Sequence, residues 1–118
     1  MAVSAPDDHL PLSPPVYHVL LAVGDDVLHG YGIMEAFERL TGGEETILAG
    51  TLYATLARMR DEGLLAEADP PAGERSGGPR RRYYRLTELG RAVARAESAR
   101  LGRLLAVARA RDLTPEAG

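Results

Sequence analysis

The stretch GTLYATLARMRDEGLL, residues 50–65, decides the fold. Its apolar residues Leu52, Leu56 and Met59 recur at spacings of four and three, which is the period of one helix face. We therefore expect a helix from about Gly50 to Glu62 that packs this face inward. The opposite face carries short or polar side chains, namely Thr51, Ala54, Thr55 and Arg58.

Two shorter helices are predicted upstream. Ser13 followed by two prolines is a helix-start signal, because serine can accept from first-turn amides and proline suits the first helical position. This helix ends near Gly24, and the next begins at His29-Gly30-Tyr31 and stops at Gly42-Gly43. Residues before Leu10 are expected to be a loose tail. The short apolar pair at 47–48 could form a brief strand.

A hairpin and a long helix are predicted downstream. Segments 64–68 and 81–86 are extended in character and flank a loop rich in proline and glycine, 69–80. Because strand side chains alternate, we expect one of Tyr83 and Tyr84 in the core and the other on the surface.

Thr87 is expected to cap the last helix, of about 22 residues. This helix has more apolar positions than a small body can cover, which predicts burial against a second copy of the chain. The alternative is packing against the chain's own first helix. The predicted dimer residues are Leu89, Val93, Leu101, Leu104, Leu105 and Ala108.

The composition excludes several kinds of chemistry. The 118 residues fit one domain and contain no cysteine, so disulfides, thiolate metal sites and cysteine nucleophiles are absent. The three histidines are scattered, and no glycine-rich phosphate loop, GxSxG or HExxH motif occurs. We expect no metal, no cofactor and no enzymatic activity. The longest apolar run, Val19 to Val23, is too short for a membrane helix. We therefore expect a soluble cytoplasmic protein.

The charge is unevenly distributed along the chain. The formal net charge is −3, but residues 1–57 hold one basic against eight acidic residues, whereas residues 58–118 hold thirteen basic against nine acidic ones. Five arginines fall within residues 75–85, which contain no acid. Screening over roughly 8 Å lets such a patch act locally on phosphates. Every basic residue is arginine, which reflects either a codon bias of the source genome or a use of the guanidinium fork.

Three motifs resemble the PadR family of transcriptional regulators: HGYGIMEAF at 29–37, GTLYATLARMRDEGLL at 50–65 and RRRYYRLTELGR at 80–91. The resemblance covers about residues 10–110, and it departs from the family at Ala54, where proline is frequent. It implies a mainly helical winged helix-turn-helix protein that dimerises through its last helix and binds DNA. It also implies a repressor released by a small molecule or stress signal.

The residues themselves indicate how such a protein would meet double-stranded DNA. Short side chains at the start of the third helix allow close approach to the major groove, the opening of the second helix suits a phosphate, and the arginines of the hairpin suit flanking phosphates. The candidate DNA-binding residues are His29, Gly30, Tyr31, Gly50, Thr51, Tyr53, Ala54, Thr55, Arg58, Arg75, Arg80, Arg81, Arg82 and Tyr83.

Each of these assignments has a structural alternative. Thr51 could simply cap its helix, Tyr53 could be an aromatic at the edge of the core, and Gly30 could serve only a tight turn with Tyr31 packed on the first helix. The domain division we expect is a flexible tail (1–9), a DNA-binding domain (10–87), a dimerisation helix (88–110) and a second tail (111–118). The alternative function is a winged-helix module that binds an acidic protein and not DNA. A small-molecule effector, if the protein has one, would enter between the two chains near Tyr17.

Overall fold

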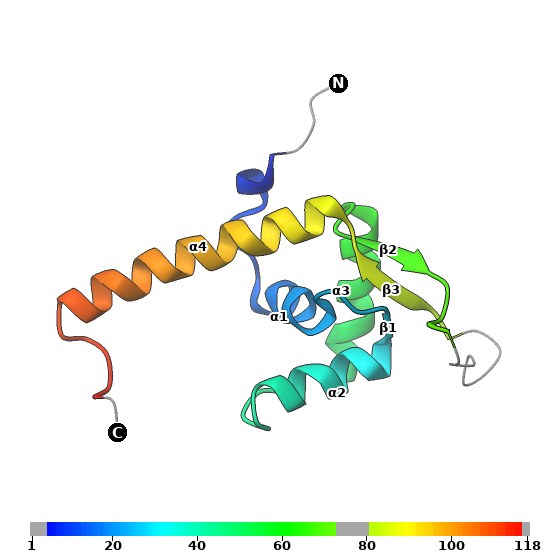
Figure 1. Cartoon of the computed structure of the whole chain (residues 1–118), viewed down its shortest axis with the longest axis horizontal. Helices are drawn as coiled ribbons and strands as arrows, with labels where there is room; N and C mark the ends of the chain where they lie inside the picture. The colour runs from blue at the N-terminus through cyan, green and yellow to red at the C-terminus, as the bar shows by residue number, and fades with distance from the viewer. Residues whose placement is uncertain (1–4, 73–80, 117–118) are drawn as a thin grey trace.

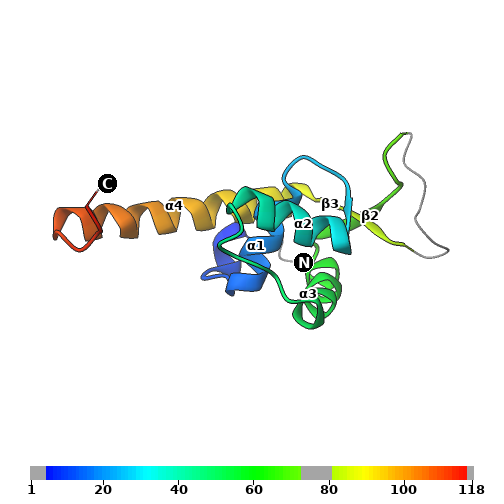
Figure 2. The same ribbon diagram turned by 90° about the horizontal axis from the view of Figure 1, so that it is seen from below.

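The computed structural model of the chain describes residues 5–72 and 81–116. Three helices and a small sheet form the body, and the fourth helix, α4, runs along one side of it and projects beyond it (Figures 1 and 2). In chain order the elements are η1 (Pro6–His9), α1 (Pro14–Val23), β1 (Leu28–His29), α2 (Gly30–Leu40), α3 (Ala49–Asp61), β2 (Leu65–Ala68), β3 (Tyr83–Leu86) and α4 (Glu88–Ala110).

The core lies between α1, α2 and α3. The prediction for α3 is confirmed, because Leu52, Leu56 and Met59 are each at most 1% exposed. They pack with α1 residues such as Val19 and with Ile33 of α2 in one apolar cluster. Helix period and burial therefore agree on the face of α3 that holds it to the body.

The sheet has three antiparallel strands in the order β1-β3-β2. The predicted hairpin is confirmed, with Leu65 opposite Leu86 and Ala68 opposite Tyr83. The brief strand considered at 47–48 is wrong: Ile47 is buried in the core, and Leu48 is exposed and serves as the N-cap of α3. The third strand is instead β1, which lies before α2.

Both hairpin tyrosines are buried, so the expectation that one of them faces solvent is wrong. Tyr84 joins the apolar core, whereas Tyr83 lies directly opposite His29 of β1 and meets its ring edge-on at 5.3 Å. The alternation of faces is as expected, but β1 makes β3 the central strand and His29 covers its outer face.

The chain is ordered earlier than expected, since Pro6–His9 forms the 3₁₀ helix η1. Ser13 is the N-cap of α1 as predicted, but its side chain makes no capping hydrogen bond. The two prolines that follow set the helical φ without it.

A buried carboxylate holds the start of the chain to α4. Glu97 is 2% exposed, accepts the amide N–H of Leu12 at 3.0 Å and pairs with Arg100. The hydrogen bond from Arg100 holds the pKa of Glu97 below its usual range, against the opposing effect of burial. Sequence reasoning missed this residue, although its position four residues from both Val93 and Leu101 places an acid on the apolar stripe of α4.

The start of α4 is fixed by Thr87. Its side chain caps the helix as predicted, accepting from the Gly90 amide at 2.9 Å, and its hydroxyl donates to the carbonyl of Gly63. Its own amide donates to the carbonyl of Leu64 at 3.2 Å. Gly90 packs so closely here that a Cβ would lie 2.1 Å from that same carbonyl oxygen. Helices α1–α3 followed by this hairpin form a winged helix-turn-helix, as the sequence predicted.

We predict that Gly90→Ala lowers the free energy of unfolding by about 1–3 kcal/mol, because its methyl group meets backbone that cannot move aside cheaply. Gly102→Ala is the matched control, since no atom beyond its own chain neighbours and helix backbone lies within 4 Å of a Cβ there. It should be neutral or stabilising by up to about 1 kcal/mol. Urea denaturation at one protein concentration measures both, and equal effects of the two variants would contradict the close packing at Gly90.

We predict that Glu97→Gln lowers the melting temperature at pH 7 and has little effect in acid. Because the pKa of Glu97 is lowered in the folded state, its stabilisation is complete at neutral pH and is lost as pH falls through that lowered value. The difference from the parent chain should therefore shrink below about pH 4. Glu38→Gln, at an exposed position, is the control. A difference that does not change with pH would contradict the ionised role of Glu97.

Candidate nucleic-acid interface

The outer face of α3 is accessible and built of small side chains. Gly50, Thr51 and Ala54 are exposed, and Thr55 is half-buried. No atom lies within 4 Å of a Cβ at Gly50. The N-cap of α3 is Leu48, so Thr51 does not serve as the cap. The leucine side chain makes no capping hydrogen bond. Short exposed side chains at the start of this helix can approach base edges closely.

Arg58 lies further along α3. It is exposed, and its Nε lies 3.5 Å from Oε2 of Glu62, four residues on. This ion pair is in contact with water and contributes little to stability. The Arg58 guanidinium can therefore exchange its partner for another anion at little cost.

His29 organises the entry to α2. Its Nδ1 accepts the Gly32 amide at 3.0 Å, its ring stacks near that of Tyr31 at 6.5 Å, and its Nε2 lies 3.4 Å from Nη1 of Arg81. We expected the first-turn amides of α2 to suit a phosphate, but the amide of Gly32 is occupied by His29. His29 instead joins α2 to the arginines of the hairpin.

Gly30 and Tyr53 form a second contact between α2 and α3, outside the core. Gly30 is buried, and a Cβ there would lie 2.8 Å from Cε1 of Tyr53. We expected Gly30 to let a phosphate approach the backbone, but its close neighbour is this ring. Tyr53 is nevertheless 59% exposed, and Tyr31 is 58% exposed and not packed away beneath α1.

The described part of the hairpin presents two arginines to solvent. Arg81 and Arg82 are exposed just before β3, and Nε of Arg82 lies 3.9 Å from Oε1 of Glu67. Arg75 and Arg80 lie outside the described residues. Tyr83 is 2% exposed, so its assignment as a DNA-binding residue is wrong: its ring packs against His29.

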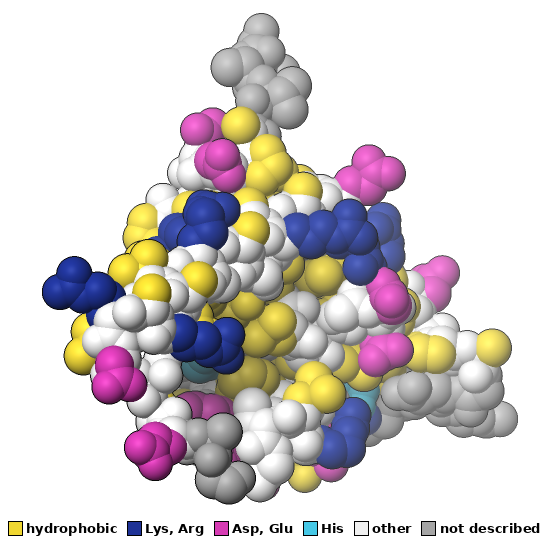
Figure 3. Space-filling model, turned by 60° about the vertical axis from the view of Figure 1, so that its left-hand side comes forward, with side chains coloured by type: hydrophobic (Ala, Val, Ile, Leu, Met, Phe, Trp, Pro, Cys, Tyr) yellow, Lys and Arg dark blue, Asp and Glu magenta, His cyan; other side chains and the backbone are white. Residues whose placement is uncertain are grey.

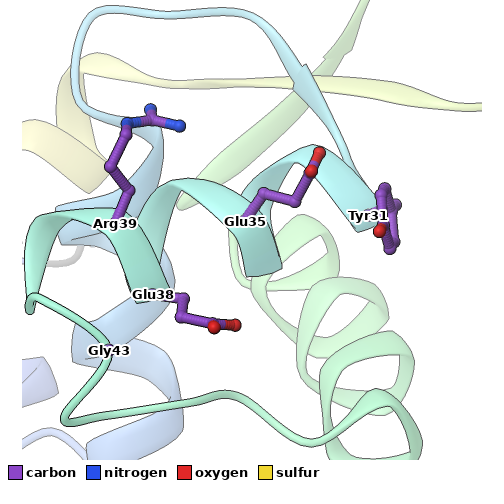
Figure 4. Close-up of a pocket in the computed structure, with 5 residues that line it drawn as sticks. All are labelled: Tyr31, Glu35, Glu38, Arg39 and Gly43. Atoms are coloured by element: carbon purple, nitrogen blue, oxygen red, sulfur yellow. The ribbon is translucent and has the colours of Figure 1, made fainter.

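The remainder of α2 has a different character. A shallow cavity of about 490 Å³ is lined by residues of α2 and the turn after it, with Tyr31 at one end of the helix and Arg39 near the other (Figure 4). Glu35 and Glu38 lie between them. These carboxylates repel phosphate. On α2, only the first turn is therefore suited to contact nucleic acid. Within the described residues, no group of three side chains could hold a metal ion.

The last helix divides into two halves. Val93 is fully buried, so its assignment to a dimer interface is wrong: it fills the chain's own body. Leu89 is partly buried and packs against the core. The second half behaves differently, because Leu101, Leu104 and Leu105 are 37%, 54% and 44% exposed. Val107, which sequence reasoning missed, is 60% exposed. Ala108 is half-buried.

The projecting half of α4 borders an apolar hollow. Figure 3 brings this end of the molecule forward and shows apolar side chains gathered in the middle of the face, with arginines around them. Leu21 of α1 is also 44% exposed.

No helix among the described residues has the length and apolar character that crossing a membrane requires.

The fold, with an accessible α3 and a hairpin beside it, defines a helix-turn-helix protein of the winged class. The sequence matches the transcriptional regulator PadR-like family over residues 19–96, which is most of the chain. The chain therefore belongs to the PadR-like family of transcriptional regulators. This membership agrees with the interpretation of the protein as a regulator and not an enzyme.

Solved structures share the fold. A PadR family regulator from Eggerthella lenta is 28% identical, with a TM-score of 0.65 over 85% of this chain and 82% of that one. A PadR family regulator from Clostridium difficile is 22% identical, with a TM-score of 0.64 over 82% and 96%. PadR of Bacillus subtilis, solved in complex with operator DNA, is 21% identical, with a TM-score of 0.60 over 77% of this chain and 48% of that one. Among curated proteins, none matches the sequence.

Proposed function

We propose that this protein is a sequence-specific DNA-binding regulator that acts as a homodimer on an inverted-repeat operator. The observation that carries the proposal is the division of α3 into a buried apolar face and an exposed face of small side chains. A helix built in this way can enter the major groove while the body holds it rigidly. PadR of Bacillus subtilis, which has the same fold, was solved in complex with operator DNA, and this supports DNA binding.

In the proposed complex, base edges are read from the first two turns of α3. Thr51 can donate to or accept from a base or phosphate, and Ala54 can contact a thymine methyl group. Tyr53 and Arg58 extend from the same helix toward the sugar-phosphate backbone. Gly50 and Thr55 complete the close surface.

The hairpin supplies contacts that carry little sequence information. Arg81 and Arg82 are exposed beside the entry to α2, and we assign them, with Arg75 and Arg80, to the phosphates that flank the major groove or to the adjacent minor groove. The contact of Arg81 with His29 places this charge next to the first turn of α2. The acidic remainder of α2 opposes binding through its own part of the surface.

The second half of α4 supplies the proposed dimer contact. Leu101, Leu104 and Leu105 expose apolar surface on a helix that projects from the body (Figure 2). To read an inverted repeat, a two-fold pairing through this surface has to set two copies of α3 about 34 Å apart, one turn of duplex. In this proposal, residues 10–87 bind DNA and the end of α4 binds the second copy.

The apolar hollow beside α4 is where we propose that a small-molecule effector acts. Tyr17 of α1 hydrogen-bonds Ser98 of α4 at 2.7 Å, and the exposed Leu21 lies on the same helix. A ligand seated between two chains there would change the spacing of the two α3 helices. We propose that the regulator is a cytoplasmic repressor, and that this change in spacing releases it from its operator.

The direct test is binding to a duplex that contains the upstream region of the protein's own gene, beside a scrambled duplex of equal length. Preferential binding to the first supports the proposal. If the protein binds both duplexes equally or binds neither, and is retained on an acidic protein surface, the interaction-module alternative is favoured.

We predict that replacing both Arg81 and Arg82 by alanine weakens binding to all duplexes and flattens the salt dependence. Each lost phosphate contact should reduce the slope of log K against log salt by about one. Arg39 of α2 and Arg95 of the first half of α4, both exposed and outside the proposed DNA and dimer contacts, are the control pair. A slope unchanged by the Arg81/Arg82 replacement would remove the hairpin from the interface.

We also predict that Leu101→Asp and Leu105→Asp each yield monomers, because pairing would bury an unpaired carboxylate. Binding to the inverted repeat should fall at least about tenfold, since each monomer contacts one half-site. Leu40→Asp places the same change on an exposed position of α2 and should leave the dimer intact. Sedimentation measures the assembly state, and intact dimers of both α4 variants would move the interface elsewhere.

A further inference from the structure

Gly30 meets Tyr53 so closely that a larger residue fits only if the tyrosine ring moves. The three atoms nearest to a Cβ at Gly30 all belong to Tyr53, namely Cε1 at 2.8 Å, Oη at 3.0 Å and Cζ at 3.1 Å. The backbone does not itself require glycine, because Gly30 is not among the residues with a positive φ. The need for glycine at this position is therefore set by the tyrosine ring.

We propose that Gly30 is a positioning residue for DNA recognition, which holds the exposed Tyr53 side chain in one orientation on α3. This inference rests on the proposed DNA-binding function. Tyr53 is 59% exposed, and the slot at Gly30 supports the end of the ring that carries its hydroxyl. A side chain fixed before binding loses less conformational entropy when it contacts DNA.

The consequence of filling the slot follows from what can move. The atoms in the way are the far end of a side chain with two rotatable bonds and not backbone. A methyl group at Gly30 should therefore displace the Tyr53 ring and leave the body folded. This differs from Gly90, where the obstacle is a backbone carbonyl.

The contact is also the link between two elements of the interface. Gly30 opens α2 directly after His29, whose ring lies 3.4 Å from Arg81 at the start of the hairpin strand. Tyr53 lies on α3. The orientation of the tyrosine is consequently set by the same corner that sets the position of the arginine, so both should contact one duplex in a fixed relation.

The first experiment measures the contact without DNA. In protein labelled with ¹³C at the glycine α-carbon, the Hα signals of Gly30 should carry a ring-current shift that disappears in Tyr53→Leu. The signals of Gly102, which no side chain approaches, should not change. Gly30 signals that do not respond to Tyr53→Leu would overturn the proposal.

The second experiment measures recognition by a double-mutant cycle of Gly30→Ala and Tyr53→Ala on the duplex carrying the protein's own upstream region. Gly30→Ala alone should weaken binding by about 3- to 10-fold and lower the preference over a scrambled duplex. In the Tyr53→Ala background, Gly30→Ala should cause no further loss. Leu40→Ala, at an exposed position of α2, is the control in both backgrounds.

The outcomes separate this inference from the function on which it rests. Equal losses from Gly30→Ala in both backgrounds, or no loss in either, would overturn the positioning role while the protein still binds DNA. If the parent chain prefers no duplex, the proposed function fails, and the positioning role fails with it even where the ring-current shift shows the contact. If Gly30→Ala alone unfolds, Gly30→Ala/Tyr53→Ala should refold because the clash is removed, and a double variant that also unfolds would overturn the proposal.

Discussion

The structure depends on the corner at Thr87, where four elements meet within a few residues. One threonine caps α4, donates its hydroxyl to the turn after α3, and donates its amide to the residue that precedes β2. Gly90 allows the first turn of α4 to lie against the same turn. The direction in which α4 leaves the body is therefore fixed relative to α3 and the hairpin. In a dimer built on α4, this corner determines where the two recognition helices lie.

A second corner, at His29 and Gly30, fixes the opposite side of the interface. His29 caps α2, pairs across the sheet with Tyr83 and contacts Arg81, and the next residue accommodates the ring of Tyr53. Residues of the hairpin and of α3, which are far from His29 in the sequence, are thus held at the start of α2. A change at the Thr87 corner would alter the spacing of the surfaces proposed to face DNA, whereas a change at Gly30 would move the Tyr53 ring within one of them.

Local patterns predicted the helices, the hairpin and the buried stripe of α3, because each follows from spacing within a few residues. The errors arose where a residue's environment depends on a distant partner. From the sequence alone, Tyr83 is predicted to lie on the surface, but His29 of the two-residue strand β1 covers it. Val93 is predicted to be a dimer contact, but it is buried in the chain's own core. Glu97 acquires its role from Leu12, 85 positions away. The accessible α3 face, which depends on helix period alone, was predicted correctly.

The net charge of −3 opposes binding to nucleic acid only as a sum over the whole chain. In the proposed complex, the acidic residues of α2 and the exposed arginines beside β3 favour one orientation of the body on a duplex. Hydroxyl-radical footprinting on the upstream region of the protein's own gene tests this account most directly. The account predicts two protected patches centred about 10 base pairs apart on an inverted repeat. Uniform cleavage at a protein concentration that saturates the assay, or a single unpaired patch, would contradict it.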